Sequence, residues 1–162
     1  VCGHSIVGPL AQLDALVKGG ADPDHCYFSH VECESGWEGR SLREEAEYLE
    51  MIANRGGSLL FNNFGFEHDT PWEDLVFLIR HLIDEGCGRK ILISMDANWT
   101  IRRDGTAMLE AEDINPECRR RDYAYLFART IPALTEAGVG ERDIRMFLVE
   151  NPKVILEPNK IP

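Results

Sequence analysis

Short apolar runs alternate with amphipathic segments along the chain. Apolar and aromatic runs that end in polar residues predict four strands, at 1–3, 26–29, 58–61 and 90–94. Apolar residues at helical spacing predict helices between them, over 10–18, 42–54 and 71–85. This alternation has the spacing of βαβ units and favours an α/β fold with a parallel sheet and right-handed crossovers. A four-stranded open sheet and half of an eight-stranded barrel both fit, because a whole barrel takes ~250 residues.

Two of these helices have recognisable start signals. Ser41 and Glu44 form the S-x-x-E pattern of a capping box, in which each residue accepts a backbone hydrogen bond from the other. Thr70, directly before Pro71, is expected to cap the next helix, because proline is favoured in the first turn.

The carboxyl-terminal third of the chain is less regular. The polar stretch 97–121 is longer than ordinary connections and is expected to be a functional loop or mobile lid, or else a plain surface excursion. A helix over 122–137 contains a proline, so we expect a break near Thr130. A further helix is expected over 141–150, with Asn151 capping a last short turn.

The composition narrows the class of protein. The 162 residues, 44% hydrophobic and 28% charged, fit one soluble domain. A formal net charge of −11 argues against nucleic acid or an anionic membrane as partner, and no apolar run nears the ~20 residues that span a bilayer. Five cysteines, an odd number without a CxxC pair, favour a reducing cytoplasm. The chain opens at Val1 within a strand-like run, so we expect a single segment, 1–162, of a longer protein.

Three residues with metal-binding side chains follow predicted strands: His4, His30 and Asp96. The carboxyl ends of parallel strands share one edge of a sheet, so these side chains should converge there. Imidazole and carboxylate groups are the usual ligands of zinc and similar ions at hydrolytic sites. The alternatives are hydrogen-bonded core histidines and an aspartate that caps its own loop. No GxSxG, P-loop or GxGxxG motif supports a serine hydrolase, an NTPase or a dinucleotide site.

Five segments carry a more specific likeness, and all occur in the expected order: His4 at a strand end, Tyr27-Phe-Ser-His30, Phe61-Asn-Asn-Phe-Gly65, Ile91-Leu-Ile-Ser-Met-Asp96 and Val149-Glu-Asn-Pro-Lys-Val-Ile-Leu156. Together they resemble the second half of the phosphotriesterase family in the amidohydrolase superfamily, which includes phosphotriesterase-related proteins and phosphotriesterase-like lactonases. The resemblance implies a (β/α)8 TIM barrel of the metal-dependent hydrolase type, of which this chain covers roughly strands 5–8 and their helices.

The resemblance also implies roles for individual residues. His4 and His30 would hold the more exposed of two divalent metals, with zinc the expected ion, and Asp96 would bind the more buried one and handle the proton. The reaction would be hydrolysis of an ester, lactone or phosphotriester by a metal-activated hydroxide. The residues expected to line the substrate pocket are Asn63, Phe64, His68 and Trp99.

The chain lacks two parts of the family's pattern. The His-x-His pair and the bridging lysine or glutamate would lie on earlier strands, so the amino-terminal half of the barrel should be needed for a complete site. This fragment alone should bind metal weakly and catalyse little. Asn62 stands where related sequences often have aspartate, which puts the substrate class in doubt. A homodimer is compatible with the resemblance.

Two other functions fit the same sequence. The scaffold would serve as a binding protein for a small apolar ligand if its metals were absent and turnover were slight. Alternatively, the chain is a small open α/β domain without a site, which predicts that it folds cooperatively and stays monomeric. Metal content separates the first alternative from a hydrolase.

Overall fold

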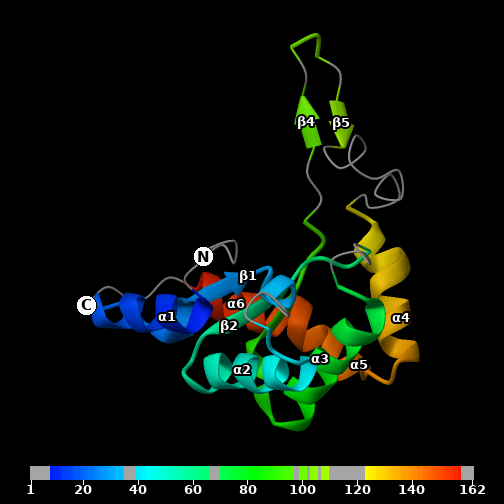
Figure 1. The fold of residues 1–162 in the computed structure, drawn as a ribbon. Coiled ribbons are helices and arrows are strands. Elements are labelled where there is room, and N and C mark those ends of the chain that lie inside the picture. The colour runs from blue at the N-terminus through cyan, green and yellow to red at the C-terminus, as the bar shows by residue number, and fades with distance from the viewer. Residues whose placement is uncertain are drawn as a thin grey trace.

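A parallel sheet of three strands forms the centre of the molecule (Figure 1). The computed structural model describes residues 8–34, 39–65, 70–96, 99–101, 103–105, 107–109 and 123–157. The strands, in spatial order β1–β2–β3, are β1 (Tyr27–Ser29), β2 (Ser58–Phe61) and β3 (Ile91–Ile93). Both pairings are parallel, as the alternation of strands and helices predicted. The strand expected at 1–3 lies outside the described residues.

Helix α1 (Pro9–Lys18) precedes β1, and helices α2 (Leu42–Asn54) and α3 (Trp72–Asp84) connect the strands in turn. Short 3₁₀ turns accompany them: η1 (Pro23–His25), η2 (Val31–Glu34) and η3 (Cys87–Lys90). The capping box at Ser41 is confirmed, since its side chain accepts from the backbone of Glu44 and the Glu44 carboxylate accepts in return. The predicted cap at Thr70 is wrong. Its hydroxyl donates to the backbone oxygen of Glu32 (3.2 Å), and no side chain caps α3.

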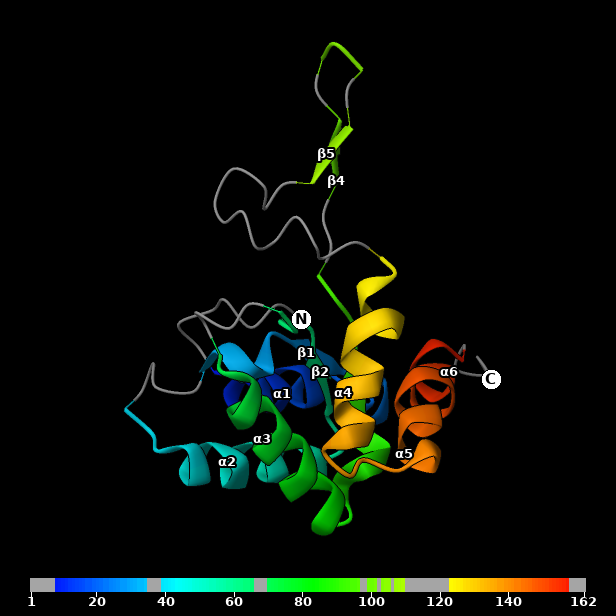
Figure 2. The ribbon, with the colours of Figure 1, turned by 90° about the vertical axis from the view of Figure 1, so that its right-hand side faces the viewer.

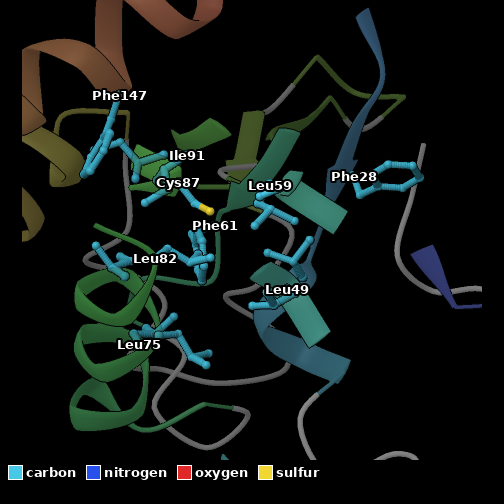
Figure 3. Packing of buried hydrophobic residues seen from close by; sticks show 14 of the residues in the cluster. Phe28, Leu49, Leu59, Phe61, Leu75, Leu82, Cys87, Ile91 and Phe147 are labelled. Atoms are coloured by element: carbon cyan, nitrogen blue, oxygen red, sulfur yellow. The ribbon is translucent and has the colours of Figure 1, made fainter. Parts of the chain in front are cut away.

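The core lies between the sheet and helices α2 and α3. Phe28, Leu59 and Phe61 are fully buried. Leu59 and Phe61 point toward Leu49 and Leu82 of helices α2 and α3, whereas Phe28 points away from these two residues (Figure 3). Alternate strand residues face the other way, and one of them, Tyr27, is 40% exposed. Burial of each large core side chain contributes roughly 1.5–3 kcal/mol. This packing fixes the strands relative to one another, and with them the residues at their carboxyl ends.

The stretch expected to be a loop after β3 contains a hairpin. Strand β4 (Trp99–Ile101) pairs antiparallel with β5 (Ala107–Leu109), and Gly105 adopts a positive φ of 83° between them. The hairpin stands away from the central sheet in two perpendicular views (Figures 1 and 2). The polar loop prediction was therefore incomplete, because two three-residue runs within 97–121 pair as antiparallel strands. Residues 97–98, 102, 106 and 110–122 of that stretch lie outside the described residues.

The carboxyl-terminal helices change type where prolines occur. The π-helical turn η6 (Leu126–Thr130) leads into α4 (Ile131–Glu136), and α5 (Glu141–Arg145) continues through the π-helical turn η7 (Met146–Glu150) into α6 (Asn151–Leu156). Proline cannot donate the usual helical hydrogen bond, so the turn before each proline widens. The break expected near Thr130 is therefore a change from a π-helical turn to an α-helix, and the chain stays helical there.

The predicted cap at Asn151 is wrong. Asn151 lies within a continuous helix, and its buried side-chain nitrogen donates to the backbone oxygens of Gly88 (2.9 Å) and Ile91 (2.7 Å). This amide ties the last helix to the amino end of β3. Among the helices that are described, none is long and apolar enough to cross a membrane.

Candidate functional site

Two of the three predicted metal ligands lie together at the carboxyl edge of the sheet. His30 directly follows β1, and Asp96 follows β3 after two residues. The parallel pairing brings the His30 Nε2 atom to 3.9 Å from the Asp96 Oδ2 atom, although β2 lies between the two strands. The third predicted ligand, His4, lies outside the described residues. The convergence of strand-end residues expected from the sequence therefore occurs for His30 and Asp96.

The backbone at both residues is left-handed. His30 has a φ of 59° and Asp96 a φ of 45°, and within the described part of the chain they are the only non-glycine residues with positive φ. The left-handed region costs a non-glycine residue about 1–2 kcal/mol, so it persists only where the surrounding structure imposes it. Such residues concentrate at functional sites. The two strained positions coincide with the two candidate ligands.

His30 is held by the residue that follows β2. Its backbone N–H donates to Asn62 Oδ1 at 3.0 Å, and Asn62 Nδ2 lies 3.4 Å from His30 Nε2. Asn62 is 4% exposed, while the side chains of His30 and Asp96 are 12% and 35% exposed. The imidazole is thus oriented from a buried neighbour, and the carboxylate beside it reaches solvent.

Glu32 is a buried carboxyl group of the site that the sequence did not reveal. Its Oε1 atom accepts hydrogen bonds from the backbone N–H groups of Asn62 (2.7 Å) and Asn63. Burial raises the pKa of Glu32 from 4.5 to about 7; the two amides and its own backbone N–H oppose this shift, and the negative charge of Asp96 adds to it. The sequence offered one signal, an acidic residue two positions after His30, but the polar segment around it has no periodicity that predicts burial.

The predicted substrate-binding residues have different surroundings. Asn63 is buried at the end of β2. Phe64 is fully buried, and its ring lies 6.2 Å from the ring of Trp72 between centroids. Trp99 belongs by its backbone to β4, and His68 lies outside the described residues. A role for these residues in binding substrate stays a prediction.

A hollow of about 380 Å³ lies between Gly65, the start of α3, and the helical segment that contains η6 and α4. Its lining includes Gly65, Trp72, Tyr125, Arg129 and Glu136, and neither His30 nor Asp96 contributes to it. The strained backbone and the ligand-type side chains are at the strand ends, so the candidate site is there and not in this hollow.

The described donors fit part of a metal site. His30 and Asp96 present an imidazole nitrogen and a carboxylate oxygen, which suit zinc and related divalent ions. Bonds from such ligands to zinc are about 2.0–2.2 Å long, so donors 3.9 Å apart can serve one ion or two adjacent ones. No group of three or more His, Cys, Asp or Glu side chains suited to a metal occurs in the part of the chain that the structure describes. Further ligands would have to come from residues outside the described part of the chain.

Comparison with known proteins gives a consistent set of matches. The family model described as the phosphotriesterase family matches residues 2–156. An aryldialkylphosphatase from Saccharolobus solfataricus is 29% identical over 93% of this chain and 44% of its own length. A phospho-furanose lactonase from Mycoplasmopsis synoviae is 27% identical over 94% of this chain and 40% of its own length. The chain therefore spans less than half the length of these curated relatives.

A solved structure shows the same fold. The phosphotriesterase from Mycobacterium tuberculosis superposes with a TM-score of 0.69 at 23% identity, covering 91% of this chain and 41% of that one. This likeness shows the α/β architecture of phosphotriesterase TIM barrels.

Proposed function

The chain belongs to the phosphotriesterase family, and we propose that it forms strands 5–8 and their helices in a (β/α)8 barrel that acts as a metal-dependent hydrolase. In this assignment β1, β2 and β3 are strands 6, 7 and 8, and 1–162 is one segment of the carboxyl-terminal half. The share of its relatives that the chain covers, 40–44%, supports this assignment. The term "complete barrel" below means this chain together with its amino-terminal half.

The observation that carries the proposal is the His30–Asp96 pair. The two side chains lie 3.9 Å apart at the carboxyl edge, and both backbones are left-handed. Active sites of α/β barrels lie at this edge. We propose that His30, Asp96 and His4 are metal ligands, with zinc the expected ion, and that the missing ligands come from the amino-terminal half.

A divalent ion at this edge would polarise an ester or phosphoryl oxygen and lower the pKa of water. The chain's own residues would then supply orientation and proton transfer. Asn62 orients the His30 ring, and the Asp96 carboxylate, which reaches solvent, can accept the proton released during hydrolysis. Asn63, Phe64, His68 and Trp99 remain candidates for contact with substrate.

The proposed substrate is a small lactone, carboxylic ester or phosphotriester. Two curated relatives are named for such compounds, an aryldialkylphosphatase and a phospho-furanose lactonase. We further propose that this chain alone turns over little, and that the complete barrel works in the cytoplasm. A homodimer is compatible with this proposal.

Turnover by the complete barrel tests the proposal. We expect hydrolysis of at least one of a γ-lactone, an aryl carboxylic ester and a dialkyl aryl phosphate. His30→Ala should reduce it more than about 100-fold, since even residues that only orient ligands contribute 10–100-fold. His81→Ala is the matched control, because His81 lies in α3 and contacts Glu50 at 3.2 Å. A protein that binds these compounds without turning them over would support a binding function instead.

A further inference from the structure

Glu32 accepts three hydrogen bonds from residues that lie 30 to 38 positions later in the chain. Its side-chain Oε1 atom accepts from the backbone N–H groups of Asn62, at 2.7 Å, and Asn63. Its backbone oxygen accepts from the Thr70 hydroxyl at 3.2 Å. Glu32 is fully buried, and the three donor residues are at most 4% exposed. Glu32 therefore joins the turn after β1 to both ends of the connection from β2 to α3.

The Glu32 carboxyl group replaces the sheet ladder where β2 stops. Strand β2 ends at Phe61, and the two N–H groups that follow it donate to Glu32. Buried N–H groups need an acceptor, because burial without one destabilises the folded state. One carboxyl oxygen has two lone pairs and can accept from both groups. The side chain of Glu32 thus fixes the direction of the backbone directly after β2.

Asn62 transmits this constraint to His30. The Asn62 Oδ1 atom accepts from the backbone N–H of His30 at 3.0 Å. His30 has a φ of 59°, a conformation that a non-glycine residue keeps only where its surroundings impose it. A hydrogen bond to an anchored side chain is such a constraint. Because Glu32 follows His30 by two residues, the three residues form a closed ring of contacts between the ends of β1 and β2.

We propose that Glu32 is a positioning residue, which acts through Asn62 to hold His30 in the left-handed conformation that places its imidazole beside Asp96. Residues that orient a ligand contribute to metal affinity without binding the metal themselves. This consequence rests on the proposed function, in which His30 is a ligand, whereas the constraint on the backbone does not.

The same carboxyl group constrains residues that are expected to contact substrate. Asn63, one of them, donates its backbone N–H to Glu32, and Phe64 follows it directly. The bond from Thr70 goes to the backbone oxygen of Glu32, so it does not depend on the side chain at position 32. Substitutions of that side chain should therefore loosen the start of the connection between β2 and α3 and leave its end in place.

Hydrogen exchange of single backbone amides in the metal-free complete barrel tests the constraint itself. Glu32→Leu removes the acceptor, so the N–H groups of Asn62, Asn63 and His30 should exchange at least about 10-fold faster than in the unsubstituted protein. Glu32→Gln keeps an acceptor on a side chain of the same length and should restore slow exchange. Glu32→Asp keeps the carboxyl group but is one methylene shorter, so it should behave like Glu32→Leu and replaces that variant if it does not fold.

Glu45→Leu is the matched control. Glu45 is as fully buried as Glu32, but it lies in α2 and its partner is Arg40, at 2.7 Å. Its loss should lower the stability of the barrel to urea without changing exchange at Asn62 or His30. If Glu32 contributed only to overall stability, both leucine variants would give the same pattern of exchange.

Zinc affinity of the complete barrel, measured by competition with a chelating dye, tests the consequence for the metal. Glu32→Leu should weaken this affinity about 10–100-fold, the range found for residues that orient metal ligands. Glu32→Gln and Glu45→Leu should leave it nearly unchanged.

Slow exchange at Asn62 and His30 in Glu32→Leu would overturn the proposal, and so would equal losses of zinc affinity in Glu32→Leu and Glu45→Leu. A complete barrel that holds no metal would instead contradict the proposed function. The exchange rates would then still decide whether Glu32 constrains His30, so the two failures are distinguishable.

Discussion

The two ends of the parallel sheet use polar residues in opposite ways. At the amino end, Lys90 bonds both Asp24 (2.7 Å) and the Gly56 oxygen (2.8 Å), and Asn151 satisfies two backbone oxygens. The left-handed positions there, at Gly56 and Gly86, are glycines. At the carboxyl end the non-glycine residues His30 and Asp96 are left-handed in addition to Gly65, and the buried carboxyl group of Glu32 accepts from the backbone N–H groups that follow β2.

This difference separates residues that stabilise the fold from residues of the candidate site. At the amino end, polar side chains bond to backbone oxygens and so stabilise the fold. The left-handed positions there cause little strain, since glycine adopts positive φ freely. The carboxyl end keeps backbone strain and a buried acid, both of which reduce stability. A fold retains such costs where function requires them, as at the active-site face of α/β barrels. Substitutions at the two ends should therefore change stability in opposite directions.

Asn151→Leu, at the amino end, should have the largest effect. It leaves the buried backbone oxygens of Gly88 and Ile91 without this partner, and each such group costs roughly 1–3 kcal/mol. We expect a loss of about 4 kcal/mol in the free energy of unfolding, measured by urea unfolding of the complete barrel. An unchanged unfolding midpoint would show that Asn151 does not tie α6 to β3.

Glu32, at the carboxyl end, should make stability depend on pH. Its pKa is raised from 4.5 to about 7 in the folded protein, so the native state holds the proton more tightly than the unfolded chain. The stabilisation of the folded state by protonated Glu32 is fully present below pH 4.5 and is lost as the pH rises through 7. The difference between the pKa of 4.5 in the unfolded chain and about 7 in the folded protein corresponds to about 3 kcal/mol in the free energy of unfolding.

Glu32→Gln tests the assignment of this pH dependence. Glutamine keeps an acceptor for the Asn62 and Asn63 amides but does not ionise, so stability should no longer fall between pH 4.5 and 7. Urea unfolding across this range provides the measurement. If the variant kept the same slope as the unsubstituted chain, another group would be responsible.

Asp96→Gly and Gly86→Ala test backbone strain at one left-handed position from each end of the sheet. Glycine relieves the strain at Asp96 and should stabilise the chain by about 1 kcal/mol. Gly86 has a φ of 77° and open space around an added Cβ, so alanine there should cost about 1 kcal/mol through the backbone alone. Asp96→Asn, which keeps a side chain at the left-handed position, is the control. If Asp96→Gly and Gly86→Ala shifted the thermal unfolding temperature in the same direction, the contrast between the two ends of the sheet would be refuted.

Lys90→Met should have the smallest effect. The Asp24 partner is mostly exposed, and such pairs contribute at most about 1 kcal/mol because water and salt screen them. The loss should shrink further at high ionic strength. A loss above about 2 kcal/mol, unaffected by salt, would mean that the hydrogen bond to Gly56 dominates.

The sequence predicted the regular elements well for a physical reason. The strands at β1, β2 and β3 and the helices α1, α2 and α3 are encoded by local periodicity and local caps, as at Ser41. Two local assignments failed because a distant partner competes: Thr70 bonds the backbone of Glu32, and Asn151 bonds the start of β3. A side chain that could cap a helix satisfies the backbone of another element instead.

The site was predictable only in part. That His30 and Asp96 share an edge follows from the parallel topology, which local patterns indicate. The burial of Glu32 depends on backbone groups thirty residues away, and the left-handed conformation of His30 and Asp96 depends on tertiary packing. Neither leaves a periodic trace in the sequence. The hydrogen bond between His30 and Asn62 likewise emerges only once β1 and β2 are paired.

The metal content of the complete barrel tests most directly whether His30 and Asp96 share a metal site. Purified without chelator, the protein should hold divalent metal in a whole-number ratio to the chain. His30→Ala and Asp96→Ala should each lower that ratio, whereas His81→Ala should leave it unchanged. Equal metal content in all four proteins, or hydrolysis by a barrel that holds no metal, would contradict the proposed site.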